Sequence, residues 1–196
     1  MNKNILLCGV GGQGTVLASK LIAAAAMHRG IDVRTAETIG MAQRGGSVFS
    51  HLRMGDDLNA PLIGPGRADL LIGFEPAEAV RMLPWLKKGG AAVVSTRPVM
   101  PVSALIGESS YPVEEILACL RRRVPRLTLV DADRAAADLG SSKVLNVVLL
   151  GAALRSGELG LNEEDLRSAI RERVPARFHE LNERALQYTA RAAAQT

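Results

Sequence analysis

The segment ILLCGVGGQG, residues 5–14, decides the fold. Its apolar half, Ile5–Cys8, predicts a strand, and the run Thr15–Met27 predicts the helix that follows. Between them the glycines are spaced G-x-G-x-x-G from Gly9 to Gly14, which permits a tight turn and lets a phosphate approach amide N–H groups at a helix N-terminus. The segment therefore predicts a strand–turn–helix unit, in which the glycines serve either phosphate contact or close helix–strand packing.

Further apolar runs extend this unit into an α/β fold. They predict strands over residues 32–37, 47–54, 68–74, 91–95 and 127–130, and helices over 76–88, 113–124, 142–154, 163–174 and 178–194. We expect a Rossmann-like, mostly parallel sheet with flanking helices and a helical C-terminal extension. One domain over 1–196 is the simplest division, with an α/β core over about 1–140 and a helical part over about 141–196.

Composition narrows the class of function. The chain has 196 residues, of which 47% are hydrophobic and only 3% aromatic, and its net charge is +4. So few aromatic residues argue against a base-stacking nucleic-acid surface. The two cysteines, Cys8 and Cys119, are too few for an iron–sulfur cluster or a zinc site. We expect both to be small buried side chains, and the lack of a disulfide framework predicts a protein of the reducing cytoplasm. We find no targeting segment and no apolar stretch long enough to span a membrane.

A second glycine-rich loop follows the second predicted strand. It contains Arg44, Gly45 and Gly46, in a place where an ordinary dinucleotide fold enters a helix. Arg44 is suited to bind a phosphate or carboxylate bidentately, or to form an ion pair with another subunit. Glu37, which ends the second strand, is the candidate for holding ribose hydroxyls in a dehydrogenase.

No catalytic constellation stands out in the sequence. His51 shares one face of the strand predicted over 47–54 with Phe49 and Arg53. We expect it to be a surface or interface histidine rather than a general base. Asn146 lies in an apolar helix and needs a hydrogen-bond partner, which favours a role in fixing a loop. We therefore predict no catalytic residue and no metal ligand in this chain.

Four motifs in order resemble the gamma-type domain of 2-oxoacid:acceptor oxidoreductases, most closely the beta subunit of indolepyruvate ferredoxin oxidoreductases. They are the glycine segment at the N-terminus, the Gln43–Val48 loop with its strand, the run Ala68–Ile72 with Glu75 after it, and Asn146–Ala152 in a late apolar helix. The residues Gly40–Gln43 before the second loop resemble the indolepyruvate branch, whereas many members of the wider family have Pro-Glu there.

The resemblance implies a division of labour between two subunits. A larger partner would carry thiamine diphosphate, Mg²⁺ and the iron–sulfur clusters, would decarboxylate the 2-oxoacid, and would pass electrons to ferredoxin and the acyl group to coenzyme A. This chain would cover the active site and help to hold coenzyme A, without a tightly bound cofactor of its own. The expected site comprises Gly9, Gly11, Gly12, Gln13, Gly14, Arg44, Gly45 and Gly46.

Two other functions fit the same residues. One is a self-sufficient NAD(P)-dependent dehydrogenase that uses Glu37, and the other is a nucleotide-sensing module without catalysis. Gln13 does not distinguish between these functions, because it is placed either to hydrogen-bond a ligand or to cap the helix.

Overall fold

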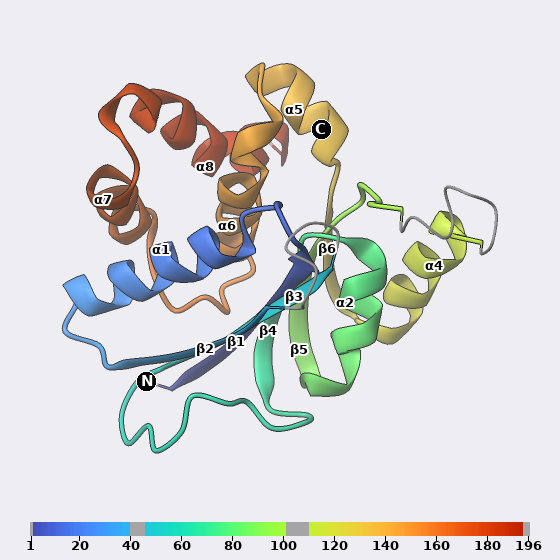
Figure 1. Ribbon diagram of the computed structural model, residues 1–196, viewed down its shortest axis with the longest axis horizontal. Helices are drawn as coiled ribbons and strands as arrows, with labels where there is room; N and C mark the ends of the chain where they lie inside the picture. The colour runs from blue at the N-terminus through green and yellow to red at the C-terminus, as the bar shows by residue number, and fades with distance from the viewer. Residues whose placement is uncertain (1, 40–45, 101–109, 194–196) are drawn as a thin grey trace.

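A six-stranded sheet in the order β2-β3-β1-β4-β5-β6 forms the centre of the computed structural model (Figure 1). The structure describes residues 2–39, 46–100 and 110–193. The strands are β1 (Lys3–Val10), β2 (Val33–Ile39), β3 (Ser47–Met54), β4 (Ala68–Gly73), β5 (Leu86–Ser95) and β6 (Arg126–Val130). Pairing is parallel from β1 through β4 and β5 to β6, and antiparallel on both sides of β3. The predicted mostly parallel sheet is confirmed.

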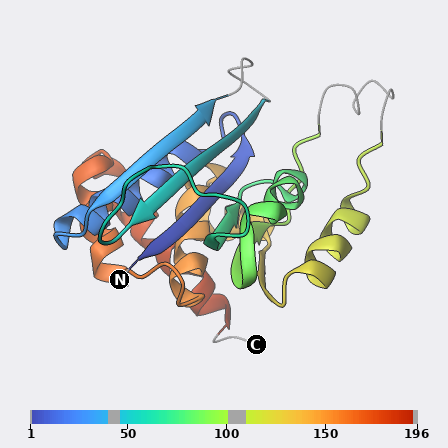
Figure 2. The same cartoon turned by 90° about the horizontal axis from the view of Figure 1, so that it is seen from below.

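The antiparallel strand β3 lies between β1 and β2. Figure 2 shows its arrow running against those of both neighbours. Val10 at the end of β1 pairs with Ser47 at the start of β3, and Lys3 pairs with Met54. Strands β1 and β2 therefore run in the same direction, as predicted, but they are not neighbours in the sheet.

Helices cover both faces of the sheet and divide its core into two clusters. One face is covered by α2 (Pro76–Met82) and α4 (Val113–Arg123), which pack on the β1 side chains Leu6 and Cys8. The other face, which carries Ile5 and Leu7 of β1, is covered first by the helices α1 (Thr15–His28) and α6 (Leu145–Arg155). Around these pack α5 (Ala132–Leu139), α7 (Glu163–Arg173) and α8 (His179–Ala193).

The end of α2 differs from the prediction. A helix was expected to continue to about residue 88, but α2 ends at Met82, the short 3₁₀ helix η1 follows over Leu83–Trp85, and β5 already begins at Leu86. Pro84 explains the early end, because proline has no N–H to donate and its ring collides with the carbonyl four residues earlier. The pair Lys87–Lys88 therefore starts a strand instead of ending a helix.

The C-terminal helices share the buried cluster of the sheet's α1 face. A 3₁₀ turn η2 (Ser142–Val144) leads into α6, and η3 (Ala176–Phe178) leads into α8. The predicted start of α7 is confirmed: Asn162 and Asp165 form a reciprocal capping box. No helix in the described part of the chain combines the length and apolar character that a membrane crossing needs.

A glycine allows α6 and α8 to approach closely. A Cβ atom on Gly151 would lie 2.1 Å from the carbonyl oxygen of Leu186 in α8. Arg155, one turn later in α6, donates to the carbonyls of Leu186 and Gln187 at 3.5 and 3.3 Å. The Arg155 side chain thus holds α8 against α6, next to a position where only glycine fits.

Candidate functional site

The β1–α1 turn is built around Gly9, the last but one residue of β1. A Cβ atom there would lie 2.7 Å from both Gln13 Oε1 and Phe74 Cβ. Gly9 is therefore required by packing inside the turn. Gly9 fixes the shape of the turn but does not line the hollow above it.

The side chain of Gln13 fastens this turn to the next strand of the sheet. Its Oε1 accepts from the backbone N–H of Val10 at 2.7 Å, and its Nε2 donates to the carbonyl of Phe74 at 3.0 Å. Phe74 directly follows β4, so one carboxamide ties together the ends of β1 and β4. Of the two roles expected for Gln13, this geometry favours the structural one.

At the carboxyl edge of the sheet, the first glycine loop contacts Gly46, the described end of the second loop. The N–H of Gly11 donates to the carbonyl of Gly46 at 2.9 Å, which continues the β1–β3 ladder by one bond. The amide of Gly11 is consequently used inside the protein. Gly46 thus lies beside the first loop, whereas Arg44 and Gly45 lie outside the described residues.

Gly12 and Gly14 form the open part of the turn. Both have left-handed backbones, with φ of +100° and +82°. Gly14 is the N-cap of α1, and neither a side-chain cap nor an acidic residue occupies the first turn of this helix. Uncapped N–H groups and the helix dipole together attract an anion.

A hollow of about 330 Å³ lies over this helix end. It is lined by the first glycine turn, the start of α1 and one residue of β3: Val10, Gly11, Gly12, Gly14, Thr15, Val16 and Val48. Thr15 was missed in the sequence. Its Oγ1 is buried, has no hydrogen-bond partner in the described part of the chain, and lies 3.2 Å from the place of a Cβ atom on Gly9. Only its position immediately after Gly14 could have indicated it.

Asn146 lies directly behind Gly14. A Cβ atom on Gly14 would be 3.0 Å from its Nδ2, so Asn146 lies beside a loop as expected, but among the described residues its side chain forms no hydrogen bond that would fix this loop. Its Oδ1 accepts from the N–H of Val147 at 3.0 Å. Gly14 is therefore constrained twice, by its left-handed backbone and by the buried carboxamide behind it.

Two buried carboxylates occupy the neighbouring end of β4. Glu75 caps α2 by accepting from the N–H of Glu78 at 2.9 Å, and its other oxygen accepts from the Tyr111 hydroxyl and from the N–H of Val99 at 3.4 Å. Glu78 accepts from the hydroxyl of Ser47 at 2.6 Å. This hydrogen-bond network connects the start of β3 and α2, and it also connects α2 to the segments on either side of residues 101–109. Sequence reasoning identified Glu75 but missed its partners.

These carboxylates change the chemistry of two nearby groups. Burial and the hydrogen bond to Glu75 raise the pKa of the Tyr111 hydroxyl. Burial, reinforced by Glu78 and Glu75, raises the pKa of the Cys8 thiol well above its usual value. Both groups therefore stay protonated at neutral pH, and Cys8 is not a nucleophile. Within the described residues, no group of three or more His, Cys, Asp or Glu side chains could hold a metal ion.

His51 is not the surface residue that the strand pattern suggested. It is 5% exposed, and its Nδ1 accepts from the N–H of Ile63 at 3.1 Å. The long connection between β3 and β4 folds back over this strand face and buries the ring, and that burial lowers the pKa of His51. A neutral, hydrogen-bonded imidazole here fixes the connection.

Glu37 does not reach the glycine turn. It pairs with Ser50 of β3, which in turn pairs with Leu7 of β1. Two strand spacings, about 9–10 Å in all, therefore separate Glu37 from β1. The ribose-binding role needs an acidic residue on the strand next to β1, so this geometry disfavours the dehydrogenase alternative.

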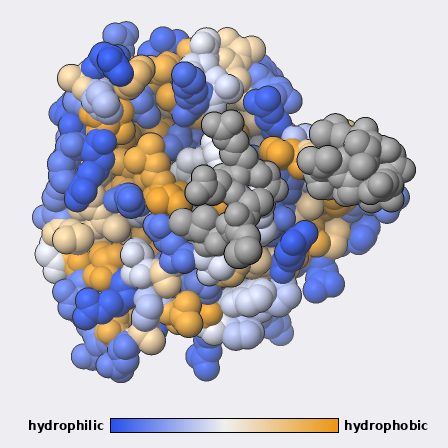
Figure 3. Space-filling view, viewed as in Figure 1, coloured by the Kyte–Doolittle hydropathy of each residue, from blue (hydrophilic) through white to orange (hydrophobic). Residues whose placement is uncertain are grey.

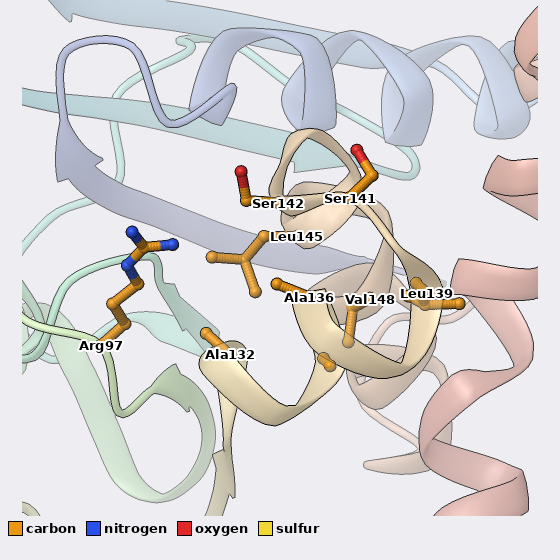
Figure 4. A pocket seen from close by; sticks show the side chains of 9 residues that line it. Arg97, Ala132, Ala136, Leu139, Ser141, Ser142, Leu145 and Val148 are labelled. Carbon is orange, nitrogen blue, oxygen red and sulfur yellow. The ribbon is translucent and has the colours of Figure 1, made fainter.

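Another recess lies farther along the same edge of the sheet, beside α5 and the start of α6 (Figure 4). Small and apolar side chains line it, with Arg97 at its mouth and Ser141 and Ser142 on the opposite wall. Arg97 forms an ion pair with Asp133 at 3.4 Å. The recess has no space for a water molecule, so the hollow over α1 is the better candidate site.

Comparison with known proteins identifies the family. The family model described as pyruvate ferredoxin/flavodoxin oxidoreductase matches residues 4–194. The indolepyruvate oxidoreductase subunit IorB of Archaeoglobus fulgidus is 43% identical over 187 residues, which cover 95% of this chain and 92% of that protein.

Solved structures share the fold. The gamma subunit of a keto/oxoacid ferredoxin oxidoreductase from Geobacter sulfurreducens superimposes with a TM-score of 0.71 at 26% identity, over 99% of each chain. A 2-oxoglutarate:ferredoxin oxidoreductase from Magnetococcus marinus, solved with coenzyme A bound, gives a TM-score of 0.71 at 21% identity, over 100% of this chain and 31% of the other. From the full-length family match and the near full-length relative, we conclude that this chain belongs to the pyruvate ferredoxin/flavodoxin oxidoreductase family.

Proposed function

We propose that this chain is the accessory subunit of a ferredoxin-linked 2-oxoacid oxidoreductase that converts indolepyruvate, or a related arylpyruvate, to the aryl-acetyl-coenzyme A, CO₂ and reduced ferredoxin. The 43% identity to an indolepyruvate oxidoreductase subunit over 95% of the chain carries this proposal. We expect the assembly in the cytoplasm, because the buried Cys8 and the half-buried Cys119 are both free thiols.

The decarboxylation itself belongs to the larger subunit in this scheme. Thiamine diphosphate, Mg²⁺ and iron–sulfur clusters need a set of ligands that the described residues of this chain do not offer: Cys8 lies inside β1, Cys119 lies in α4, and no metal-binding cluster forms among the described side chains. We therefore assign these groups to the partner and expect the isolated chain to be inactive.

The part proposed for this chain is to hold coenzyme A by its phosphates. The observation behind it is the hollow over the N-terminus of α1, where the amides of Gly12, Gly14 and Thr15 are not used by the β1–β3 ladder and no side chain caps the helix. Gly9, Gly11, Gln13 and Gly46 shape this turn, and we propose that Arg44 and Gly45 complete the contact from the second loop. Holding the phosphates would orient the thiol end toward the partner's active site.

Assays of the two subunits, apart and combined, test the subunit role. We expect no 2-oxoacid oxidation by this chain, little by the larger subunit, and coenzyme A-dependent reduction of ferredoxin by the mixture. Full activity of the larger subunit alone would refute the proposal. A mixture without turnover that still binds a nucleotide would favour the nucleotide-sensing module.

Substitution of Arg44 tests the coenzyme A contact. Arg44→Ala should remove a charge-assisted hydrogen bond of about 1.5–3 kcal/mol, which corresponds to roughly a 10- to 150-fold rise in KM for coenzyme A. Arg34→Ala, on the exposed edge strand β2, is the matched control and should leave this KM unchanged. If Arg44→Ala instead preserves KM but abolishes co-purification with the larger subunit, Arg44 is an interface residue and the phosphate role is wrong.

A further inference from the structure

A second groove lies beside the glycine turn and is lined in part by Asn146. It has a volume of about 240 Å³ and runs between the first turn of α1, the start of α6 and the ends of α7 and α8 that face each other. Its walls are mainly apolar and are formed by Leu17, Val144, Val174, Pro175, Phe178 and Leu181. In Figure 3, hydrophobic residues gather on this face between the positions of α1 and α8.

Two large apolar side chains border the groove and face solvent. Leu17 is 37% exposed and Phe178 is 41% exposed, and the guanidinium of Arg177 lies 4.8 Å from the centre of the Phe178 ring. An aromatic ring stacked with an arginine beside an apolar pocket is the chemistry that dominates the binding energy of protein interfaces. The groove therefore has the composition of a contact surface.

Two buried carboxamides in the groove retain unused hydrogen-bonding groups. Asn146 uses its Oδ1 on the N–H of Val147, and Asn182 uses its Nδ2 on the carbonyl of Phe178 at 2.8 Å. Within the described part of the chain, the NH₂ of Asn146 and the Oδ1 of Asn182 have no partner. One free donor and one free acceptor match the C=O and N–H of a peptide backbone.

The rim of the groove is positively charged. Lys143 and Arg177 are exposed and form no ion pair with any described residue, while Arg173 pairs with its neighbour Glu172 at 2.9 Å. Cations without partners around an apolar pocket favour an occupant that carries carboxylates beside its apolar side chain.

We propose that this groove binds a segment of the larger subunit in which one aromatic or large aliphatic side chain is flanked by Asp or Glu. The apolar side chain enters between Leu17 and Phe178, its backbone amide pairs with Asn146 and Asn182, and the flanking carboxylate meets the cationic rim. This inference rests on the proposed subunit role. In this arrangement the C-terminal helices hold the larger subunit next to the glycine turn.

Affinity between the two purified subunits tests the groove directly. Phe178→Ala should raise the Kd of the complex at least about tenfold, as expected when an interface loses a large aromatic contact. Lys143→Glu should also raise the Kd, mainly by slowing association, and should weaken its dependence on salt. The controls are Met27→Ala and Lys20→Glu, which alter an exposed apolar and an exposed basic residue of α1 outside the groove.

The outcomes separate this inference from the proposed function. Kd values within twofold of wild type for both groove variants, in protein that melts like wild type, overturn the inference, as does self-association of the chain that only these variants abolish. A rise in KM for coenzyme A with unchanged Kd assigns the groove to the coenzyme and leaves the subunit role intact. Failure of the wild-type chain to bind the larger subunit at all refutes the proposed function itself. If Phe178→Ala fails to fold, Leu17→Ala replaces it.

Discussion

The close contact between α6 and α8 gives a sharp prediction for Gly151→Ala. Alanine usually stabilises a helix interior relative to glycine by about 1 kcal/mol. Here the added methyl group would lie 2.1 Å from the carbonyl oxygen of Leu186, and 2.9 Å from its carbonyl carbon. To reach ordinary contact, α8 must move away by about 1 Å, which would also lengthen the hydrogen bonds from Arg155. Overpacking of this kind costs about 1–3 kcal/mol and sometimes more.

The clash is with the backbone of Leu186, which cannot turn aside as a side chain can, so the cost should lie in the upper part of this range, at about 2–3 kcal/mol. Subtracting the helix gain leaves a net loss of stability of about 1–2 kcal/mol for Gly151→Ala, or roughly 2–8 °C in Tm for a chain of this size. Chemical denaturation gives the free energy, and hydrogen exchange should show faster exchange of the α8 amides. Gly157→Ala is the control: unlike Gly151, Gly157 has a left-handed backbone, at φ +74°, so alanine costs stability there through local strain, but no atom lies within 4 Å of the added carbon and α8 should keep its protection. A Gly151→Ala variant that unfolds at or above the wild-type temperature would refute the argument.

Three further predictions concern stability. The folded-state pKa of His51 is lowered by burial, so wild type should lose stability as pH falls below about 6.5, and His51→Asn should remove this dependence in pH-resolved urea titrations. Lys3 and Arg126 lower the pKa of Glu158 to about 2, so the stability deficit of Glu158→Gln should be full above the unfolded pKa near 4.5 and should shrink as pH falls toward 2; a deficit independent of pH would contradict this assignment. Asn162→Ala removes the capping box of α7 and should cost about 1 kcal/mol in thermal unfolding, and an unchanged Tm would show that the cap adds nothing.

Local patterns predicted most of the elements of the fold. The glycine turn, β3 with its bounds, β4, α4 and the start of α7 all depend on residues close in sequence, and each appears where its pattern placed it. The order of the strands could not be predicted in this way. No pattern within residues 47–54 predicts that this strand pairs antiparallel with both β1 and β2, because strand pairing depends on contacts between residues distant in sequence.

The candidate site was likewise only partly predictable from local sequence patterns. The G-x-G-x-x-G spacing located the turn but could not distinguish the free amides from the used ones, because the partner of Gly11 is Gly46, 35 positions later. His51 was misjudged for a similar reason, since the connection that buries it belongs to another segment. Thr15 carries no distinguishing pattern at all, and only its unpartnered, buried hydroxyl marks it.

The buried carboxylate of Glu75 has a consequence for variation in chain length. One of its oxygens accepts from the backbone of Val99 and from the hydroxyl of Tyr111, so both ends of the intervening stretch are fixed at a single point. Closing a longer loop between fixed ends is inexpensive in entropy: doubling the number of residues adds only about 0.6 kcal/mol. Homologues that keep Glu75 and Tyr111 should therefore tolerate insertions between residues 99 and 111 with little loss of stability, and the carboxyl edge of the sheet could acquire new surface beside the candidate site while its core stays unchanged.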